Sequence, residues 1–199
     1  MALRADMTFW DHLEALRWTL VRSFTAIGIF FVAGFAFIPY IFDHVVMAPS
    51  RDDFFLYRFL ARLGEVLPLV PGEVIKPFNV DIINIKLSSQ FFLHISLSLW
   101  LALLVSFPYL VYEVWKFVCP ALYDNERKGI KFTFLFGTIM FYLGCVIGYT
   151  VVFPLTLRFL YTYEISSFIT NQLSLDSYMN NFLMLIFMMG IVFELPLLA

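Results

Sequence analysis

Four uncharged stretches constrain this chain more than any other feature. They run from 23 to 42, 87 to 112, 132 to 157 and 177 to 193, and none contains Lys, Arg, Asp or Glu. A helix needs about 20 mostly apolar residues to cross the hydrocarbon core of a bilayer. The pattern therefore predicts an all-α, polytopic bundle of four transmembrane helices.

The composition agrees with a membrane protein. Of the 199 residues, 61% are apolar and only 14% are charged, whereas a soluble domain has about 25% charged residues. The net charge of −2 comes without a basic stripe, so we expect no nucleic-acid partner. Cys119 and Cys145 show neither disulfide nor metal-site spacing, and we expect no cofactor and no metal.

A single membrane domain is expected, with its N-terminus in the cytoplasm. The four spans cover about 20–42, 88–112, 131–154 and 177–199. The loops between them are a periplasmic loop at 43–87, a cytoplasmic loop at 113–130 and a periplasmic loop at 155–176. This orientation follows from the positive-inside rule, because the compact second loop is the one that concentrates cations.

Local signals refine the expected helices. Phe153 and Pro154 predict the outer end of the third span, and Ser174 is the predicted N-cap of the fourth. A short amphipathic helix is expected over 52–63 in the first external loop, with Ser50 as its cap. We expect this helix either to lie on the membrane surface or to pack on the ends of the spans.

No enzyme motif is present in the sequence, and HExxH, GxSxG, the P-loop and GxGxxG are all absent. The most informative single residue is Glu194, about 18 Å past Phe182 at 1.5 Å per residue. An ionisable group at that depth is costly and indicates a functional role. The alternative is that the Glu194 side chain extends to the membrane surface or pairs with a polar partner for helix packing. Pro196 weakens the helix ladder behind it. A small proton- or ion-coupled transporter or channel that uses Glu194 is the alternative function.

Two further segments combine charge with aromatic side chains. The stretch 108–128 reads PYLVYEVWKFVCPALYDNERK, and loops of this kind on a rigid scaffold often bind ligands. The stretch 10–22 is an amphipathic helix start with Trp and Arg anchors. Taken singly, the charge cluster of the first, Asp124 with Glu126, Arg127 and Lys128, is more typical of a solvated charge run at a helix start. The second, taken singly, is more typical of an interfacial helix.

Together these segments resemble the TatC family of the twin-arginine protein translocase. The similar segments occur in the order of the family: HLEALR at 12–17, AP at 48–49, FPYLVYEVWKFVCPALYDNERK at 107–128, YLGCVIGYTVVFPL at 142–155 and GIVFELP at 190–196. The resemblance implies a glove-shaped bundle of six helices with both termini in the cytoplasm. This chain then supplies the first four helices, and we expect it to be truncated at its C-terminus.

The resemblance also implies a function in transport, not in enzymatic catalysis. The family is a receptor and scaffold in the bacterial cytoplasmic (inner) membrane. It binds the twin-arginine signal peptides of folded precursor proteins, whose export the proton motive force drives. The expected partners are therefore these signal peptides, single-span subunits of the TatA and TatB type, and other TatC copies within the lipid bilayer.

The resemblance assigns roles to particular residues. Glu126 is the first choice for binding the signal peptide, because carboxylates pair bidentately with guanidinium groups. The second family carboxylate falls on Ala15, and Glu14 and Asp11 are the candidates to replace it, although one helical step rotates a side chain by about 100°. The remaining candidates are Arg127, Phe117 and Glu113 for signal-peptide binding, Glu194 and Pro196 inside the membrane, and Pro49, Pro108, Trp115, Pro120 and Tyr123 for loop structure.

Overall fold

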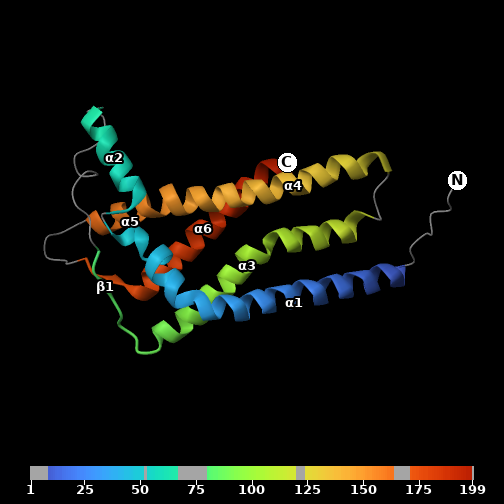
Figure 1. Cartoon of the computed structure of the whole chain (residues 1–199), viewed down its shortest axis with the longest axis horizontal. Coiled ribbons are helices and arrows are strands. Elements are labelled where there is room, and N and C mark those ends of the chain that lie inside the picture. Colours follow the sequence, from blue (N-terminus) through green and yellow to red (C-terminus); the bar gives the residue numbers. More distant parts are fainter. Residues whose placement is uncertain (1–8, 52, 67–79, 120–123, 164–170, 199) are drawn as a thin grey trace. The chain divides into compact units, whose positions relative to one another are not determined.

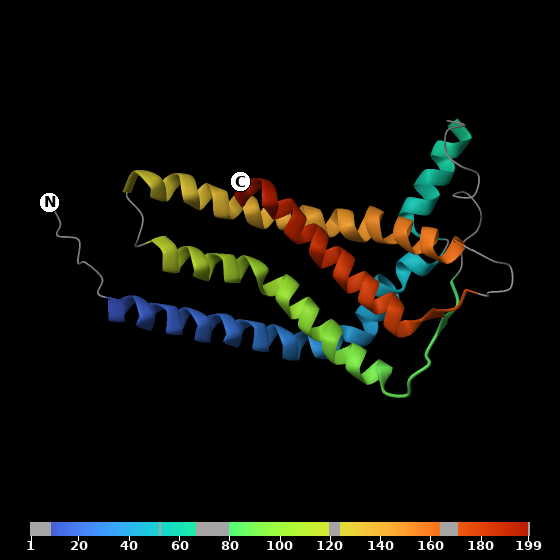
Figure 2. The same cartoon turned by 180° about the vertical axis from the view of Figure 1, so that it is seen from behind.

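The structure is a computed structural model that describes residues 9–51, 53–66, 80–119, 124–163 and 171–198 (Figures 1 and 2). Helices dominate this part of the chain. The elements are α1 (Phe9–Ile41), the π-helical turn η1 (Phe42–Val46), the 3-10 turn η2 (Ala48–Ser50), α2 (Phe55–Val66), β1 (Ile82–Ile83), α3 (Ser89–Val118), α4 (Asp124–Ile147), the π-helical turn η5 (Gly148–Val152), α5 (Phe153–Thr162), β2 (Leu173–Ser174) and α6 (Leu175–Leu198).

Four helical stretches are long and apolar enough to cross a membrane: Trp10–Leu60, Ser89–Val118, Phe132–Thr162 and Leu175–Pro196. The predicted class, a helical membrane protein with four spans, is therefore confirmed. The sequence did not predict the short parallel pair of β1 and β2, in which Ile82 lies opposite Leu173 and Ile83 opposite Ser174.

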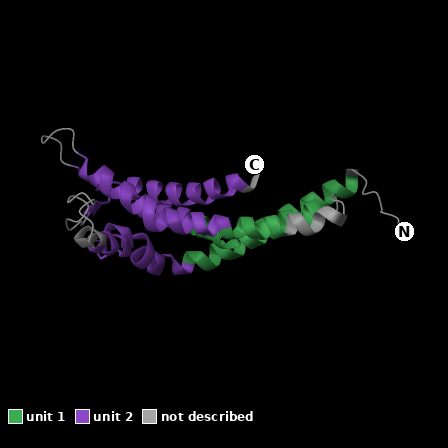
Figure 3. Cartoon of the chain, turned by 90° about the horizontal axis from the view of Figure 1, so that it is seen from above, with its two compact units in different colours: residues 1–35, 98–139 green, residues 36–97, 140–199 purple. Residues whose placement is uncertain are grey.

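The chain forms two compact units (Figure 3). Unit 1 contains residues 1–35 and 98–139, and unit 2 contains residues 36–97 and 140–199. In unit 1, the described part of α1 runs antiparallel to the second half of α3 (Figures 1 and 2). The part of unit 1 around Arg22, where the beginning of α1 meets the end of α3, is the Arg22 edge. The part of unit 2 around Arg158 of α5 is the Arg158 edge.

The third span continues past Pro154, so the prediction that its helix ends there is wrong. A π-helical turn at Gly148–Val152 precedes the proline, and α5 then extends to Thr162. Pro154 stands in the first turn of α5. A proline is tolerated at that position because its missing N–H has no intrahelical acceptor to satisfy.

The predicted helix caps had different outcomes. Ser174 is confirmed, because the backbone N–H of Ser177 donates to its Oγ at 3.3 Å as α6 begins. Ser50 is not the cap of the helix in the first external loop, since α2 begins only at Phe55. The Ser50 hydroxyl instead donates to the carbonyl of Met47 at 2.8 Å and closes the η2 turn.

Aromatic packing forms the core of unit 2 near the Arg158 edge. Phe153 meets Tyr178 edge to face at 5.3 Å between ring centroids, and it meets Phe182 at 5.0 Å. Phe153 and Tyr178 are almost fully buried. This cluster joins α5 to α6.

Three tyrosine hydroxyls complete that core by donating to backbone carbonyls. Tyr149 donates to Val45 at 2.9 Å, Tyr178 donates to Val46, and Tyr57 reaches both Pro49 at 3.1 Å and Pro154 at 3.2 Å. The carbonyls of Val45, Val46 and Pro49 lie at η1 and η2, where the regular helical ladder is interrupted, and that of Pro154 lies in the first turn of α5. Buried backbone groups need such partners.

Glycines let α4 and α6 approach closely within unit 2. A Cβ atom added at Gly144 would lie 2.5 Å from the backbone oxygen of Met189. One added at Gly190 would lie 2.7 Å from the ring of Phe141 and 2.8 Å from Cys145 Sγ. Membrane helices commonly use small residues for such backbone contact.

We predict that Gly144→Ala destabilises the purified protein by about 1–3 kcal/mol, the usual cost of overpacking a well-packed core. The reason is that the Met189 carbonyl is backbone and cannot rotate away. The measurement is the free energy of unfolding in a mild detergent. Gly28→Ala is the matched control, because no atom lies within 4 Å of its added Cβ. Equal stability of both variants would contradict the close crossing.

Candidate functional site

The candidate site is built where the beginning of α1 meets the end of α3 in unit 1. The rings of His12 and Phe117 stack with centroids 4.4 Å apart. Two turns further along α1, Thr19 is buried, and Arg22 reaches Glu113. His12, Thr19 and Arg22 follow the periodicity of one helix face, so this face of α1 is the one that contacts α3.

Glu113 is the best-connected charged residue of this contact. Its side chain is only 3% exposed, and its Oε2 lies 3.1 Å from Nε of Arg22. Its Oε1 accepts a hydrogen bond from the Tyr109 hydroxyl at 2.9 Å. A buried carboxylate needs partners of this kind. The Arg22 side chain is 41% exposed, so it covers the solvent side of a carboxylate that is otherwise enclosed.

Sequence reasoning named Glu113 but missed its partners Arg22 and Tyr109. A usable signal was present: Arg22 is the last charge before the first apolar stretch, and Glu113 is the first charge after the second. Consecutive spans run antiparallel, so these two charges belong to the same membrane edge. Opposite charges at one edge are natural partners, because an unpaired charge next to the hydrocarbon is costly.

The two candidate replacements for the family carboxylate lie at the start of α1. Glu14 is exposed and Ala15 is half-buried. At about 100° per residue, Glu14 stands about 200° from His12, on the opposite side of the helix from Phe117. Ala15 stands on the His12 side. Asp11 is exposed one step before His12. Glu14 therefore does not occupy the direction that a carboxylate at position 15 would have.

The aromatic candidates of the predicted cytoplasmic loop continue α3. Trp115 packs against Phe134 of α4 with ring centroids 5.5 Å apart, and Phe117 makes the stack with His12. Pro108 lies inside α3 and is exposed. Pro120 and Tyr123 fall outside the described residues. Glu126 and Arg127 belong to the first turns of α4, but their side chains are outside the described part of the chain.

Glu194 lies on α6 in unit 2, one turn beyond the close contact at Gly190. Its side chain is half-buried, and its Oε1 has no hydrogen-bond partner among the residues that the structure describes. Pro196 follows within the same helix and is exposed. Pro49, the remaining candidate, is fully buried in η2, and its carbonyl accepts the Tyr57 hydroxyl.

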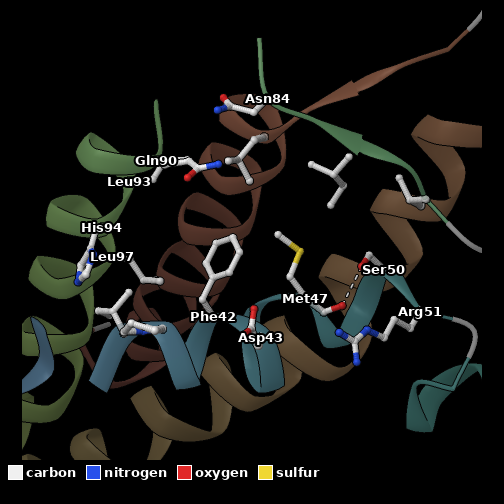
Figure 4. Close-up of a pocket in the computed structure, with 15 residues that line it drawn as sticks. Phe42, Asp43, Met47, Ser50, Arg51, Asn84, Gln90, Leu93, His94 and Leu97 are labelled. Atoms are coloured by element: carbon white, nitrogen blue, oxygen red, sulfur yellow. Dashed lines mark hydrogen bonds between the residues drawn. The ribbon is translucent and has the colours of Figure 1, made fainter. Parts of the chain in front are cut away.

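A cavity in unit 2 is separate from all these candidates. It lies in unit 2, encloses about 590 Å³ and is lined by η1, η2, β1 and the beginning of α3 (Figure 4). Its polar groups include Asp43, Arg51, Gln90 and His94. None of the sequence-predicted site residues lines it. The cavity adjoins the end of α1 and the beginning of α3, whereas the candidate site lies at the beginning of α1 and the end of α3.

Four membrane-length helices with charge pairing at their edges define a multi-pass integral membrane protein. Residues 11–199 match the family described as TatC, Sec-independent protein translocase protein. The chain belongs to this TatC family, whose role is in protein transport. The family match does not favour the transporter or channel alternative.

Relatives support the assignment at the level of the whole chain. The chain is 34% identical to the Sec-independent protein translocase protein TatC of a Blattabacterium species over 193 residues, which cover 96% of this chain and 73% of the relative. The TatC protein of Deinococcus radiodurans is 32% identical, with 98% of this chain and 64% of the relative covered. The chain thus spans about two thirds to three quarters of these two proteins.

Solved structures agree with the sequence comparisons. A crystal structure of the twin-arginine translocase receptor TatC in the detergent DDM superposes with a TM-score of 0.69 at 28% identity, covering 94% of this chain and 73% of that protein. A second crystal structure of this receptor gives a TM-score of 0.66 at 27% identity. The fold is therefore that of TatC.

We predict that Arg22→Leu destabilises the purified protein, because it leaves the Glu113 carboxylate buried with only Tyr109 as a partner. The expected loss is about 1–3 kcal/mol, the cost of an unsatisfied buried group. The double variant Arg22→Leu with Glu113→Leu should recover most of it, since apolar replacement of both partners is often neutral. The unfolding free energies of the parent protein, the two single variants and the double variant form a double-mutant cycle. Strictly additive losses in the two single variants would contradict the pairing.

Proposed function

We propose that this chain is the receptor and scaffold subunit of a twin-arginine translocase. It binds twin-arginine signal peptides of folded precursors at the Arg22 edge, which faces the cytoplasm, and the proton motive force drives their export. The family assignment supports the transport role. The positive-inside rule supports the orientation, because the loop that follows Glu113 is rich in cations.

The stack of His12 on Phe117 is the observation that carries this proposal. It joins two segments more than 100 positions apart in the sequence, the start of α1 and the entrance to the acidic loop. A peptide that extends across both segments meets carboxylates from α1, from α3 and from the first turn of α4. Two adjacent guanidinium groups require such a pair of separately placed carboxylates.

Glu126 and Glu113 are the proposed carboxylates of this pair. Position 15, which faces α3, holds an alanine in this chain. The carboxylate on that side is Glu113, which already holds the guanidinium group of Arg22. A ligand arginine takes the place of Arg22, whose exposed side chain swings out into water. Arg127 and Phe117 line the path of the peptide, whereas Glu14 and Asp11 supply negative potential from the exposed side of α1.

Glu194 has a separate role in this proposal. Its oxygen without a described partner, next to the close crossing of α4 and α6, offers a hydrogen-bond acceptor within the membrane. We propose that it binds a polar group of a single-span subunit of the TatA or TatB type. Pro196 frees a backbone carbonyl one turn earlier, which enlarges the polar patch. Other copies of the chain assemble around the same subunits.

We predict that Glu126→Gln weakens photo-crosslinking of a twin-arginine signal peptide to membranes containing this chain by roughly tenfold or more. A hydrogen bond to a charged group contributes about 1.5–3 kcal/mol, and the amide keeps the shape but not the charge. A twin-lysine peptide provides the baseline. Unchanged crosslinking in the variant would remove Glu126 from the site.

We also predict that Ala15→Glu strengthens crosslinking of the twin-arginine peptide over the twin-lysine peptide. The new carboxylate stands on the face of α1 that contacts α3. Glu14→Gln is the matched control, and it should change crosslinking less than twofold, because Glu14 is on the opposite face. A larger loss from Glu14→Gln than from Glu126→Gln would reverse the assignment.

For the membrane site, we predict that Glu194→Leu raises the unfolding temperature in detergent while it abolishes co-purification of a TatA-type subunit. The substitution removes a carboxylate oxygen that is costly to bury. A residue that serves helix packing alone behaves in the opposite way, with lower stability and unchanged co-purification. Glu194→Gln keeps hydrogen bonding and should retain part of the binding.

A further inference from the structure

Helix α2 has one buried face, and specific contacts hold it there. Leu56 and Tyr57 are buried in unit 2. The Tyr57 hydroxyl bonds to carbonyls of η2 and α5, and the guanidinium group of Arg158 lies 5.5 Å from the centre of the Tyr57 ring. With 12 residues, α2 is about 18 Å long, too short to cross a hydrocarbon core of about 30 Å.

The opposite face of α2 is aromatic and cationic. Phe55 is 72% exposed and Phe59 is 50% exposed, and their rings stack with centroids 6.2 Å apart. At about 100° per residue, Arg58 and Arg62 project from the same side of the helix as these rings. Arg58 pairs with Asp53, and Arg62 is exposed without an ion-pair partner among the described residues.

The level of α2 in unit 2 follows from its contacts. Arg158 is the first charge after the third apolar stretch, so it marks the place where that span leaves the hydrocarbon. Tyr57 lies under this arginine and bonds to Pro154, one turn inside it. From this point α2 runs crosswise to α5 (Figure 1). A short helix that crosses the end of a span in this way suits the interface between hydrocarbon and water.

We propose that α2 is an in-plane membrane anchor that binds anionic phospholipid at the Arg158 edge. Phe55 and Phe59 insert among the upper acyl segments of the leaflet, and Arg62 pairs with a lipid phosphate. Aromatic rings and arginines are the side chains that favour the interface between hydrocarbon and water. The charge complementarity of Arg62 selects anionic over zwitterionic lipid.

The anchor gives unit 2 a fixed depth in the bilayer. Membrane helices can tilt or slide in response to membrane thickness, but a helix lying in the plane resists both movements. Because Tyr57 connects α2 to η2 and to α5 at once, the depth set by the two rings is transmitted to both of these segments.

The test is the depth of a fluorescent probe on α2 in the full chain, reconstituted at about one copy per vesicle. Phe59→Cys in a background with Cys119→Ser and Cys145→Ser is labelled with the fluorophore NBD. Lipids with a nitroxide at carbon 5 or carbon 12 quench the probe. We expect strong quenching, greater from carbon 5 than from carbon 12. The same label at Gln172, an exposed residue beside β2, should be quenched at least twofold less.

Lipid charge provides the second arm of the experiment. In vesicles that contain about a third phosphatidylglycerol, the fraction of probes on α2 that lipid nitroxides quench should exceed the fraction in pure phosphatidylcholine. One arginine near an anionic surface changes the equilibrium by about fivefold. Arg62→Gln should remove this increment, and so should high salt, which screens the charge. Arg17→Gln, on an exposed site of unit 1, is the matched control and should leave the increment unchanged.

Three outcomes would overturn the proposal. Equal quenching of the probes at 59 and 172 would place α2 in water. Quenching that falls as the number of chains per vesicle rises would assign the aromatic face to a second copy of the protein. Quenching with no dependence on lipid charge would refute the anionic selectivity. The labelled protein retains Phe55 and Arg62. Its fold is checked by its unfolding temperature, which should match that of the unlabelled chain.

Discussion

The lack of water inside a bilayer is the constraint on which this structure depends. Every charge must reach an edge or find a partner, and the two pairs at the ends of the spans show how this is achieved. Arg22 meets Glu113 in unit 1, and Lys86 meets Asp176 in unit 2 at 3.2 Å. Each of these charges directly flanks an apolar stretch. The first pair joins the first span to the second, and the second pair joins the second span to the fourth.

The same constraint explains the tyrosines of unit 2. The helical ladder is interrupted at η1 and η2, and the carbonyls freed there cannot turn to water within a bilayer. Tyr57, Tyr149 and Tyr178 bond to them from neighbouring elements. These bonds tie η1, η2 and α5 into one rigid end. A rigid scaffold of this kind lets recognition reside in loops and edge residues elsewhere in the chain.

The proposed recognition site shows how a buried ion pair can serve a receptor. An enclosed carboxylate is costly unless it is paired, so Glu113 holds Arg22 when no ligand is bound. In the proposal, the guanidinium group of a ligand arginine replaces that of Arg22. The Glu113 carboxylate is therefore paired both before and after the peptide binds. A lysine ammonium group cannot reproduce the planar, forked hydrogen bonding of arginine. The proposed selectivity for arginine rests on this difference between the two side chains.

The sequence by itself determined the membrane class, the four spans and the cap at Ser174, because hydrocarbon length and helix capping are local properties of the chain. It also named Glu113 and Glu194, since charges near or within apolar stretches stand out. Only the tertiary structure decided that Glu14 faces away from α3 and that Arg22 forms an ion pair with Glu113. It likewise decided that the third helix passes Pro154 on a π-helical turn. Each of these features depends on which face of a helix packs against a neighbouring helix. That neighbour is distant in the sequence, so local sequence patterns do not reveal the contact.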